Sequence, residues 1–494
     1  MAGTFVVLHN LAQNNVASPY SLAMTLRFIH LSDIHFGQEK DSSLFIQEDV
    51  REELLNDCRR MLDEETVAGP PTAILITGDL VQSGKEEEFK TAGAWLERLT
   101  NIVGCGRQDV RVIPGNHDID LQALDATGLL TQSHLRTQPV DMVETYLHKA
   151  AVQSTNPLVA KFADYRSFAG AYGSDFKGFR EPYNVATYKL DGGKAIRVIG
   201  LCSVMISDRN DKPGTMFLGR SQYSINRDSN CEDIVMIHHP LEWLMDRREA
   251  EPYLHGRPRM ILSGHEHKPD LTLVHRETDW QQVLVAAGAT NPPRQDLYHQ
   301  YTYNWIELSW NNSNGRAKLN VTVYPRVWSP KRTGFDADYV RLSGKAFKTL
   351  VVDCGVASEQ PAQPLERSED AITSSPERGK CDASDLQMQA QVLAVKSISV
   401  DSEAKMTDTN GVPPEAGNIG AFETLRFLFW RYLDRSTRHS VLAELELMPK
   451  GNTNLPSAFE REAFEEAARR NLLAKLWDAT MVHVPDTERS ANPF

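Results

Sequence analysis

The sequence is short of basic charge, of paired cysteines and of long hydrophobic runs. It carries 53 Lys and Arg residues against 66 Asp and Glu residues, for a formal net charge of -13. Because phosphate backbones favour basic surfaces, this balance argues against a dedicated nucleic-acid binder and disfavours long duplex substrates. The six cysteines have neither paired spacing nor a zinc-ribbon pattern, so we interpret them as reduced thiols of a cytoplasmic protein. The chain shows no apolar run of membrane-spanning length and no signal-peptide pattern.

Length and composition divide the chain into several parts. At 494 residues it is too long for one ordinary core. Residues 1–24 are interpreted as a leader that is disordered or follows a misassigned start, with Met24 as the natural first residue. Residues 351–420 are rich in Ser, Pro, Glu and Gln and poor in large apolar side chains, which predicts a flexible linker. We therefore expect a domain over residues 25–350, with an insertion at 119–190, and a helical domain over residues 421–485.

Short hydrophobic strands alternate with amphipathic helices in the first half of the large domain. Strands are expected at residues 26–31, 73–77, 110–113, 195–202, 233–237, 260–263, 283–287, 303–310 and 318–328. Helical spacing is found at residues 45–65 and 86–100, whereas the later strands follow one another with little helix between them. This order predicts an α/β fold of two sheets, with βαβ units first and an antiparallel-rich second half.

Residues with ligand chemistry follow five of these strands directly. The run Gly115-Asn116-His117-Asp118 places an amide oxygen, an imidazole and a carboxylate at the end of the third strand. The other four strand ends carry Asp33 and His35, Gly78-Asp79, His238-His239, and Gly264-His265 with His267. Each motif alone is weak, since Asp-x-His is far more often a turn aspartate and a surface histidine. Five together are hard to obtain by chance at the strand ends where open α/β sheets bind ligands.

The combined ligand set predicts a metal centre. Carboxylates mixed with neutral imidazoles suit Mn, Fe or Zn better than Ca or Cu. With Asp79 as a candidate bridging carboxylate, seven ligands from these motifs would make a site for two divalent ions. Such a site can hold a hydroxide against a phosphorus centre and stabilise the charge that develops on its oxygens. We therefore expect a phosphate-ester substrate.

This motif set resembles that of the calcineurin-like metallophosphoesterases, in the same order and with every ligand present. The resemblance covers residues 25–330 and implies a four-layer α/β/β/α sandwich of two mixed sheets. By analogy, one ion would be held by Asp33, His35, Asp79 and His267, and the other by Asp79, Asn116, His238 and His265. His117 would donate a proton to the leaving oxygen or grip the phosphate, and Asp118 would orient His117. The His-His-Pro run resembles the cyclic-nucleotide and glycerophosphodiester phosphodiesterase branch more than the protein phosphatases.

Several further residues have two interpretations. His239 would lie next to the metal ligands or contact the phosphate, or else it would pack against Pro240, and Arg294 would reach a phosphate or stay a solvated loop charge. His30 lies within the first strand and is interpreted as a core histidine. The insertion carries a group of aromatic residues: Tyr165, Phe168, Tyr172, Phe176, Phe179 and Tyr183. These would stack on a nucleotide base or, as we favour, form the small core of a cap.

The C-terminal part has helical spacing but no candidate catalytic group. One helix is indicated from Phe422 to Leu433, and Ser457-Ala458-Phe459-Glu460 fits a capping box that opens a second helix running past Leu476. The unit loosely resembles the effector-associated adaptor domains that bacterial conflict systems attach to enzymes, which implies a protein partner. The alternative is a bundle that docks on its parent domain or makes a dimer.

The sequence thus predicts a bacterial, metal-dependent phosphoesterase with a C-terminal interaction module. A phosphodiesterase that uses a metal-bridging hydroxide fits the motifs best. A phosphomonoesterase or nuclease of the same fold is the nearest alternative. A scaffold that keeps the fold and acts through its C-terminal module belongs to a different class, and it does not require a complete ligand set.

Overall fold

The computed structural model describes most of the chain. The described residues are 24–39, 44–151, 156–176, 178–190, 193–276, 280–290, 300–313, 315–356, 419–448 and 460–494. Residues 1–23 of the predicted leader and nearly all of the predicted linker lie outside these residues, as do Arg294 and the first three residues of the capping box, Ser457 to Phe459. Among the described residues, no helix combines the length and apolar character that a bilayer span requires.

The first sheet contains the three earliest strands and the last four. Its order is β12-β11-β10-β1-β2-β3, and β13 pairs with β11. The strands are β1 (Leu26–Leu31), β2 (Ala73–Ile76), β3 (Val110–Val112), β10 (Thr302–Ser313), β11 (Arg316–Ser329), β12 (Gly334–Ala337) and β13 (Lys348–Val356). The three early strands are parallel to one another, and the others are antiparallel.

The second sheet is formed by the middle of the chain, in the order β4-β5-β6-β7-β9-β8. Its strands are β4 (Tyr183–Lys189), β5 (Ala195–Leu201), β6 (Cys231–Ile237), β7 (Met260–Ser263), β8 (Asp270–His275) and β9 (Gln281–Ala286). The central strands are parallel and the two edge strands are antiparallel. Both sheets are therefore mixed, as the sequence predicts.

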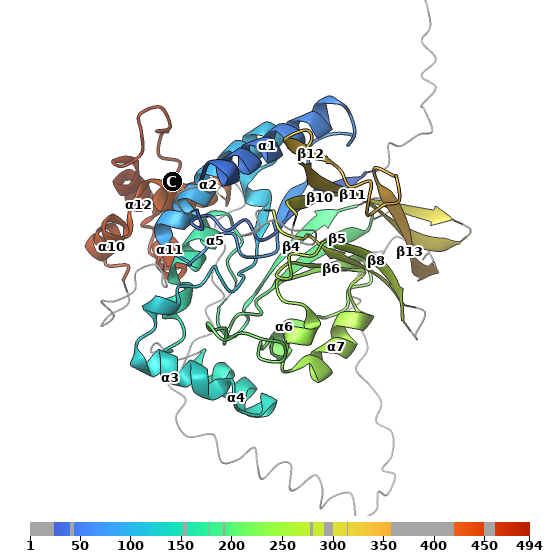
Figure 1. Cartoon of the computed structure of the whole chain (residues 1–494). Helices are drawn as coiled ribbons and strands as arrows, with labels where there is room; N and C mark the ends of the chain where they lie inside the picture. The colour runs from blue at the N-terminus through green and yellow to red at the C-terminus, as the bar shows by residue number, and fades with distance from the viewer. Residues whose placement is uncertain are drawn as a thin grey trace, which may run out of the picture. The chain divides into compact units, whose positions relative to one another are not determined.

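The two sheets pack face to face, with helices on their outer faces (Figure 1). Phe28 of β1 packs in one core cluster with Val198 of β5, whereas its neighbour Ile29 packs with the helices, as strand alternation requires. The first sheet is covered by α1 (Leu44–Asp63) and α2 (Glu86–Val103). The second is covered by α6 (Arg220–Tyr223) and α7 (Arg247–Gly256). This arrangement is the predicted four-layer α/β/β/α sandwich.

Two predicted boundaries are wrong. β13 pairs with β11 as far as Val356, so the large domain extends beyond residue 350, where the linker was expected to begin. β4 belongs to the second sheet, so the insertion ends before Tyr183 and not at residue 190. Both strands lie at sheet edges and alternate exposed with covered residues, which gives a weak hydrophobic signal.

The insertion forms α3 (Ala126–Leu135), α4 (Val140–Ala150) and α5 (Ala163–Ala171). Its aromatic residues Tyr165, Phe168, Tyr172 and Phe176 are each at most 2% exposed and belong to one hydrophobic core. The favoured interpretation of these four as core residues is therefore confirmed. Their partners differ from those expected of a separate cap, because this core continues into the C-terminal helices.

The C-terminal helices are α9 (Ile419–Tyr432), α10 (Arg435–Glu444), α11 (Glu460–Arg469) and α12 (Leu473–Met481). The second predicted helix is wrong as a single element, because it breaks between α11 and α12. Asn471 has a left-handed φ of 54°, and the Leu472 and Asn471 amides donate to the carbonyls of Ala467 and Ala468. This hydrogen-bond pair is a Schellman motif, which ends α11.

The C-terminal helices dock on the large domain through α9. Trp430 packs at 5.5 Å from Phe168 of α5 and at 6.2 Å from Tyr172, measured between ring centroids. On α2, a Cβ at Gly93 would lie 2.6 Å from the Trp430 ring, so only glycine admits the indole there. The Lys90 ammonium lies over the same ring, 4.5 Å from its centroid. These contacts match the alternative in which the bundle docks on its parent domain.

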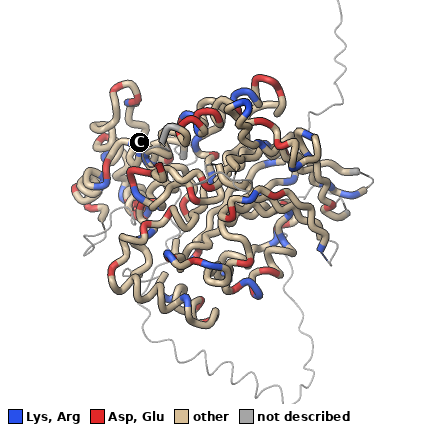
Figure 2. The backbone as a smooth tube through the Cα atoms, in the orientation of Figure 1, with Lys and Arg blue, Asp and Glu red and all other residues tan. Residues whose placement is uncertain are grey.

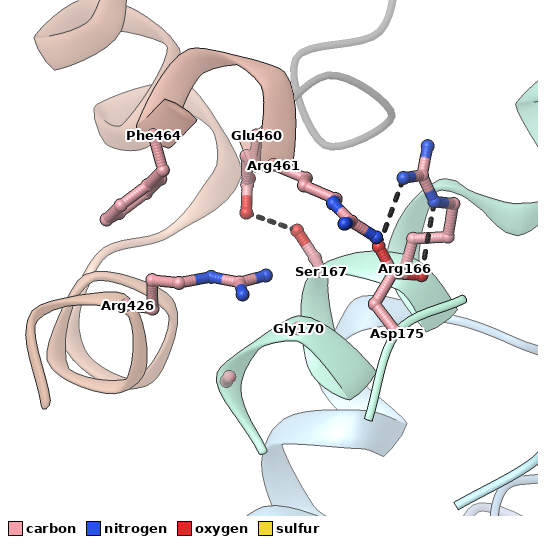
Figure 3. A pocket seen from close by; sticks show the side chains of 9 residues that line it. Arg166, Ser167, Gly170, Asp175, Arg426, Glu460, Arg461 and Phe464 are labelled. Atoms are coloured by element: carbon pink, nitrogen blue, oxygen red, sulfur yellow. Dashed lines mark hydrogen bonds and ion pairs between the residues drawn. The ribbon is translucent and has the colours of Figure 1, made fainter. Parts of the chain in front are cut away.

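A buried ionic cluster accompanies this aromatic contact. Arg438 is fully buried and donates to Glu86 of α2 at 2.6 Å and to Glu460 of α11 at 2.7 Å. Figure 3 shows Glu460 also meeting Ser167 of α5, with Arg426 reaching toward α5 beside Gly170. One guanidinium thus joins the first turn of α2 to two C-terminal helices.

We predict that Arg438→Met lowers the free energy of unfolding by about 3 kcal/mol, because it leaves two largely buried carboxylates without their cation. The matched control is Arg469→Met, whose side chain is 54% exposed and paired with Glu466, and which should change stability by less than about 1 kcal/mol. Urea titration of the full chain measures both values. Equal losses of unfolding free energy in the two variants would contradict the prediction that Arg438 contributes more to stability than an exposed, paired arginine.

Candidate metal centre

Five loops bring the predicted ligands together at the carboxyl ends of parallel strands. The loops after β1, β2 and β3 come from the first sheet, and the loops after β6 and β7 come from the second. Four groups of side chains have ligand atoms within 4.8 Å of one another: Asp33, His35 and His267; His35, Asp79 and His117; Asp33, Asp79 and His238; and His238, His239 and His265. The sequence motifs therefore converge on one cluster.

Individual distances within the cluster match ligand spacing. His267 Nε2 lies 3.2 Å from Asp33 Oδ1, and His35 Nε2 lies 3.9 Å from the same oxygen. His238 Nε2 lies 3.2 Å from Asp79 Oδ2 and 3.3 Å from the amide oxygen of Asn116. Asp79 thus has ligand atoms within 4.8 Å of His35 and His117 on one side and of Asp33 and His238 on the other.

Five of these ligands have strained backbones. Left-handed φ angles are found at Asp33 (54°), His35 (52°), Asp79 (52°), His265 (70°) and His267 (55°). For residues other than glycine, such a conformation costs about 1–3 kcal/mol and persists only where the surroundings fix it. Here the loops fix one another: the amides of Asp33 and His35 donate to the carbonyls of Gly78 and Asp79 at 3.0 Å.

The glycines of the motifs allow these loops to approach closely. Gly78 has a φ of 95°, and a Cβ there would lie 2.6 Å from Nδ1 of His238. A Cβ at Gly115 would collide with the Asp79 carboxylate, and one at Gly264 would collide with Ser32. The glycine that precedes each of these ligands is therefore a steric requirement of the cluster.

The electrostatics of the cluster favour a bound cation. Burial opposes ionisation of Asp79, but His238 and His117 outweigh it and hold the pKa of Asp79 well below its usual range. Burial likewise opposes protonation of His238, but Asp79 and Asp33 outweigh it and raise the pKa of His238 to about 9. The buried carboxylates thus draw positive charge to this point, and a divalent ion would supply it.

The histidines present their nitrogens as metal ligands do. His238 Nδ1 donates to the Thr77 carbonyl at 2.7 Å, which leaves Nε2 unprotonated toward Asp79 when the ring is neutral. Burial lowers the pKa of His35 to about 4, so that ring is neutral, and both of its nitrogens are buried without a hydrogen-bond partner among the described residues. Because buried polar atoms rarely lack partners, these residues fit divalent metal ions.

His117 and Asp118 have different roles. His117 Nδ1 donates to the Gln82 carbonyl at 2.9 Å, and its ring lies 4.9 Å from that of His35. Asp118 is buried and accepts the amides of Val81 and Gly115, each at 2.9 Å. The contact that orients the His117 ring, which the sequence assigned to Asp118, is therefore made by the Gln82 carbonyl. Asp118 instead joins the loop after β2 to the loop after β3.

Two other predicted residues lie inside the protein. His239 is fully buried, bonds Ser203 Oγ at 2.8 Å and packs 4.4 Å from the His265 ring. His239 therefore lies beside the ligand cluster, in contact with His265, and its contact with substrate stays a prediction. His30 is fully buried and bonds Thr77 Oγ1 at 3.1 Å, which confirms a core histidine.

Two cavities meet over the cluster. The first, of about 540 Å³, is lined by His35, Asp79 and His267 together with Gly37, Gln38 and Gln47. The second, of about 400 Å³, extends to Trp243 and Arg209. Gln82, Asn116, His117 and His265 line both. Sequence reasoning missed Gln82, Trp243 and Arg209, because none of them belongs to a ligand motif.

Comparison with known proteins gives two family matches. Residues 26–269 match the model described as calcineurin-like phosphoesterase, and residues 421–481 match the model described as GTPase-associated adaptor domain. A curated relative, the uncharacterized metallophosphoesterase-like protein YydB of Bacillus subtilis (strain 168), is 23% identical over 327 residues. That match covers 63% of this chain and 63% of the relative, which is less than two thirds of its length.

Solved structures with a partly similar arrangement include two nucleotidases. The 5′-nucleotidase precursor from Thermus thermophilus is 15% identical with a TM-score of 0.31, over 67% of this chain and 54% of that one. The NAD nucleotidase of Haemophilus influenzae is 13% identical with a TM-score of 0.29, over 58% of this chain and 48% of that one.

The ligand motifs, the two mixed sheets and the family match agree with one another. Calcineurin-like phosphoesterases use divalent metals, and the clustered His and Asp side chains suit such ions. The family match indicates a metal-dependent hydrolase. Residues 26–269 of this chain are therefore similar to the calcineurin-like phosphoesterases, and residues 421–481 are similar to the GTPase-associated adaptor domain.

Proposed function

We propose that this protein is a phosphodiesterase that works with two divalent ions. The observation that carries the proposal is the pair of cavities that meet over the ligand cluster and share Asn116, His117 and His265. A phosphodiester has two ester arms on one phosphorus, and each cavity accommodates one arm. A monoester would leave one of the two cavities unused.

The ligand set divides between two ions. Asp33, His35, Asp79 and His267 would hold the first ion, and Asp79, Asn116, His238 and His265 would hold the second. When bound, the ions activate water as the nucleophile and stabilise the charge that develops on the phosphoryl oxygens. The mixture of carboxylates and neutral imidazoles favours Mn, Fe or Zn.

His117 is the proton donor in this proposal. Its ring lines both cavities, and its Nδ1–H donates a hydrogen bond to the Gln82 carbonyl, so Nε2–H of the protonated ring is directed to the substrate. A proton given to the leaving oxygen prevents the build-up of alkoxide charge. Asp118 acts on this step indirectly, by fixing the loops that carry Val81 and Gly115.

The adaptor domain supports a second, separate proposal. We infer that α9–α12 bind a protein partner while α9 stays anchored on α2 and α5. The adaptor-domain match favours this function. The docked position of Trp430 restricts the partner to the faces of the bundle that α2 and α5 leave free.

We predict manganese-dependent cleavage of bis(p-nitrophenyl) phosphate, faster than cleavage of p-nitrophenyl phosphate at equal concentration. Chelation should abolish the reaction, because the ions carry the nucleophile and the charge. Absorbance of released p-nitrophenol measures both rates. Activity on the monoester alone would contradict the diesterase proposal, and activity on neither would favour a scaffold.

We predict that Asp79→Asn and Asn116→Ala reduce turnover to background while the far-ultraviolet circular dichroism spectrum stays native. Each variant removes a ligand of the second ion, and Asp79→Asn also removes the bridging charge. Asp49→Asn, an exposed change on α1, is the matched control and should keep full activity. Full turnover in either ligand variant would rule out this site.

We predict that the purified full chain holds two manganese ions per molecule and that manganese raises its melting temperature. A ligand that binds only the folded state stabilises that state. Metal analysis after gel filtration and differential scanning fluorimetry give the two values. A chain that holds no metal and gains no stability would support the scaffold interpretation.

A further inference from the structure

The second cavity, which we call the Trp243 cavity, begins at the metal centre and extends away from it. Asn116, His117 and His265 line it where it meets the first cavity, and Trp243 and Arg209 line it as well. At about 400 Å³, it falls within the volume range of small-molecule sites. Neither Trp243 nor Arg209 belongs to the ligand set, so their chemistry bears on what the cavity accepts.

The carboxylates on the wall of this cavity are already paired within the protein. Asp120 bonds Lys85 at 2.7 Å, while Asp208 and Asp211 both pair with Arg136. Arg209 lines the same cavity and forms no ion pair within the described part of the chain. Its guanidinium is therefore available to a ligand that enters the cavity.

The loop that carries Arg209 is fixed by hydrogen bonds from side chains of the insertion. Arg136, at the C-terminal end of α3, donates to the carbonyls of Ile206 at 3.1 Å and Asn210 at 3.0 Å. Lys161 is buried and donates to the carbonyl of Ser207 at 3.1 Å. The backbone on both sides of Arg209 is thus fixed by residues of the insertion. A ligand that binds Arg209 does not have to order this loop, which reduces the entropy cost of binding.

Trp243 places an aromatic surface beside the metal centre. It ends the short helix η6 (Leu241–Trp243), and its amide donates to the Pro240 carbonyl at 2.9 Å. Its ring meets that of His265 edge to face, with centroids 4.2 Å apart and an interplanar angle of 82°. The side chain is only half-buried, and the remaining surface lines the cavity. An exposed indole of this kind can stack on a planar ring.

We propose that the Trp243 cavity is the subsite for a nucleotide arm of the substrate. The base would stack on Trp243, and a second phosphate of that arm would bind the Arg209 guanidinium, which suits phosphate geometry. This inference rests on the proposed diesterase and names its substrate class: a small phosphodiester with a nucleotide on one side. A long nucleic acid is a poorer fit, because acidic and basic residues are interspersed along the described backbone (Figure 2) and the net charge is -13.

The test is calorimetric binding to the manganese-loaded full chain, with thymidine 3′,5′-bisphosphate, thymidine 5′-monophosphate and inorganic phosphate as probes. The wild type should bind the bisphosphate about tenfold tighter than the monophosphate. Arg209→Gln should remove this difference and leave the monophosphate unchanged. Trp243→Leu should weaken both nucleotides about tenfold and leave inorganic phosphate unchanged. The matched control, Arg248→Gln, changes an exposed arginine that lines neither cavity and should bind like the wild type.

Equal affinity of the wild type and Arg209→Gln for the bisphosphate would overturn the role of Arg209. Unchanged nucleotide affinity in Trp243→Leu would overturn the stacking. Failure of the proposed function is a separate result, namely no cleavage of bis(p-nitrophenyl) phosphate by the wild type. Because the binding measurement needs no turnover, it judges the subsite in either case.

Discussion

Asp33 and Asp79 lie in one buried cluster, with exposures of 0% and 2%, and their oxygens lie close to imidazole nitrogens. Two buried carboxylates at this spacing repel each other and lose hydration, so they need positive charge between them. The surrounding loops are arranged to meet that need. Holding the two carboxylates close together requires three features of these loops. Several predicted ligands have left-handed backbone angles, the neighbouring glycines have no room for a Cβ, and a backbone carbonyl fixes the His238 ring.

The site also joins the two sheets. Asp33 and Asp79 come from the first sheet, whereas His238 and His265 come from the second, and the His265 amide donates to the Asp33 carboxylate at 3.1 Å. No single sheet could form the ligand set. The face-to-face packing of Phe28 with Val198 and its neighbours therefore does more than fill a core, because it brings the two halves of the metal centre into register.

Sequence reasoning recovered the parts of this arrangement that residue types encode. Ligand motifs after buried strands are local, and five of them together are hard to obtain by chance, so Asp33, Asp79 and His238 could be placed from the sequence alone. The acceptor of His117 could not be predicted, because it is the backbone carbonyl of Gln82, which any residue would provide. Edge strands such as β4 carry little hydrophobic signal, and the break at Asn471 depends on local hydrogen bonds. Trp243 and Arg209 line the same cavity only because the chain folds, so no local sequence pattern links them.

The way the adaptor domain packs on α2 and the insertion limits how it can be exchanged between proteins. Trp430 packs against Gly93 of α2 and against Phe168 of the insertion. The charge of Arg438 is neutralised partly by Glu86 of α2. Glu86 is the first residue of α2, and it follows closely in the chain after Gln82 and Ser83, which line the Trp243 cavity. The adaptor is therefore not a freely exchangeable module. A recombination event that transplanted it onto another phosphoesterase would separate Arg438 from Glu86, and Trp430 from Gly93 and Phe168, unless α2 and the insertion were transferred with it.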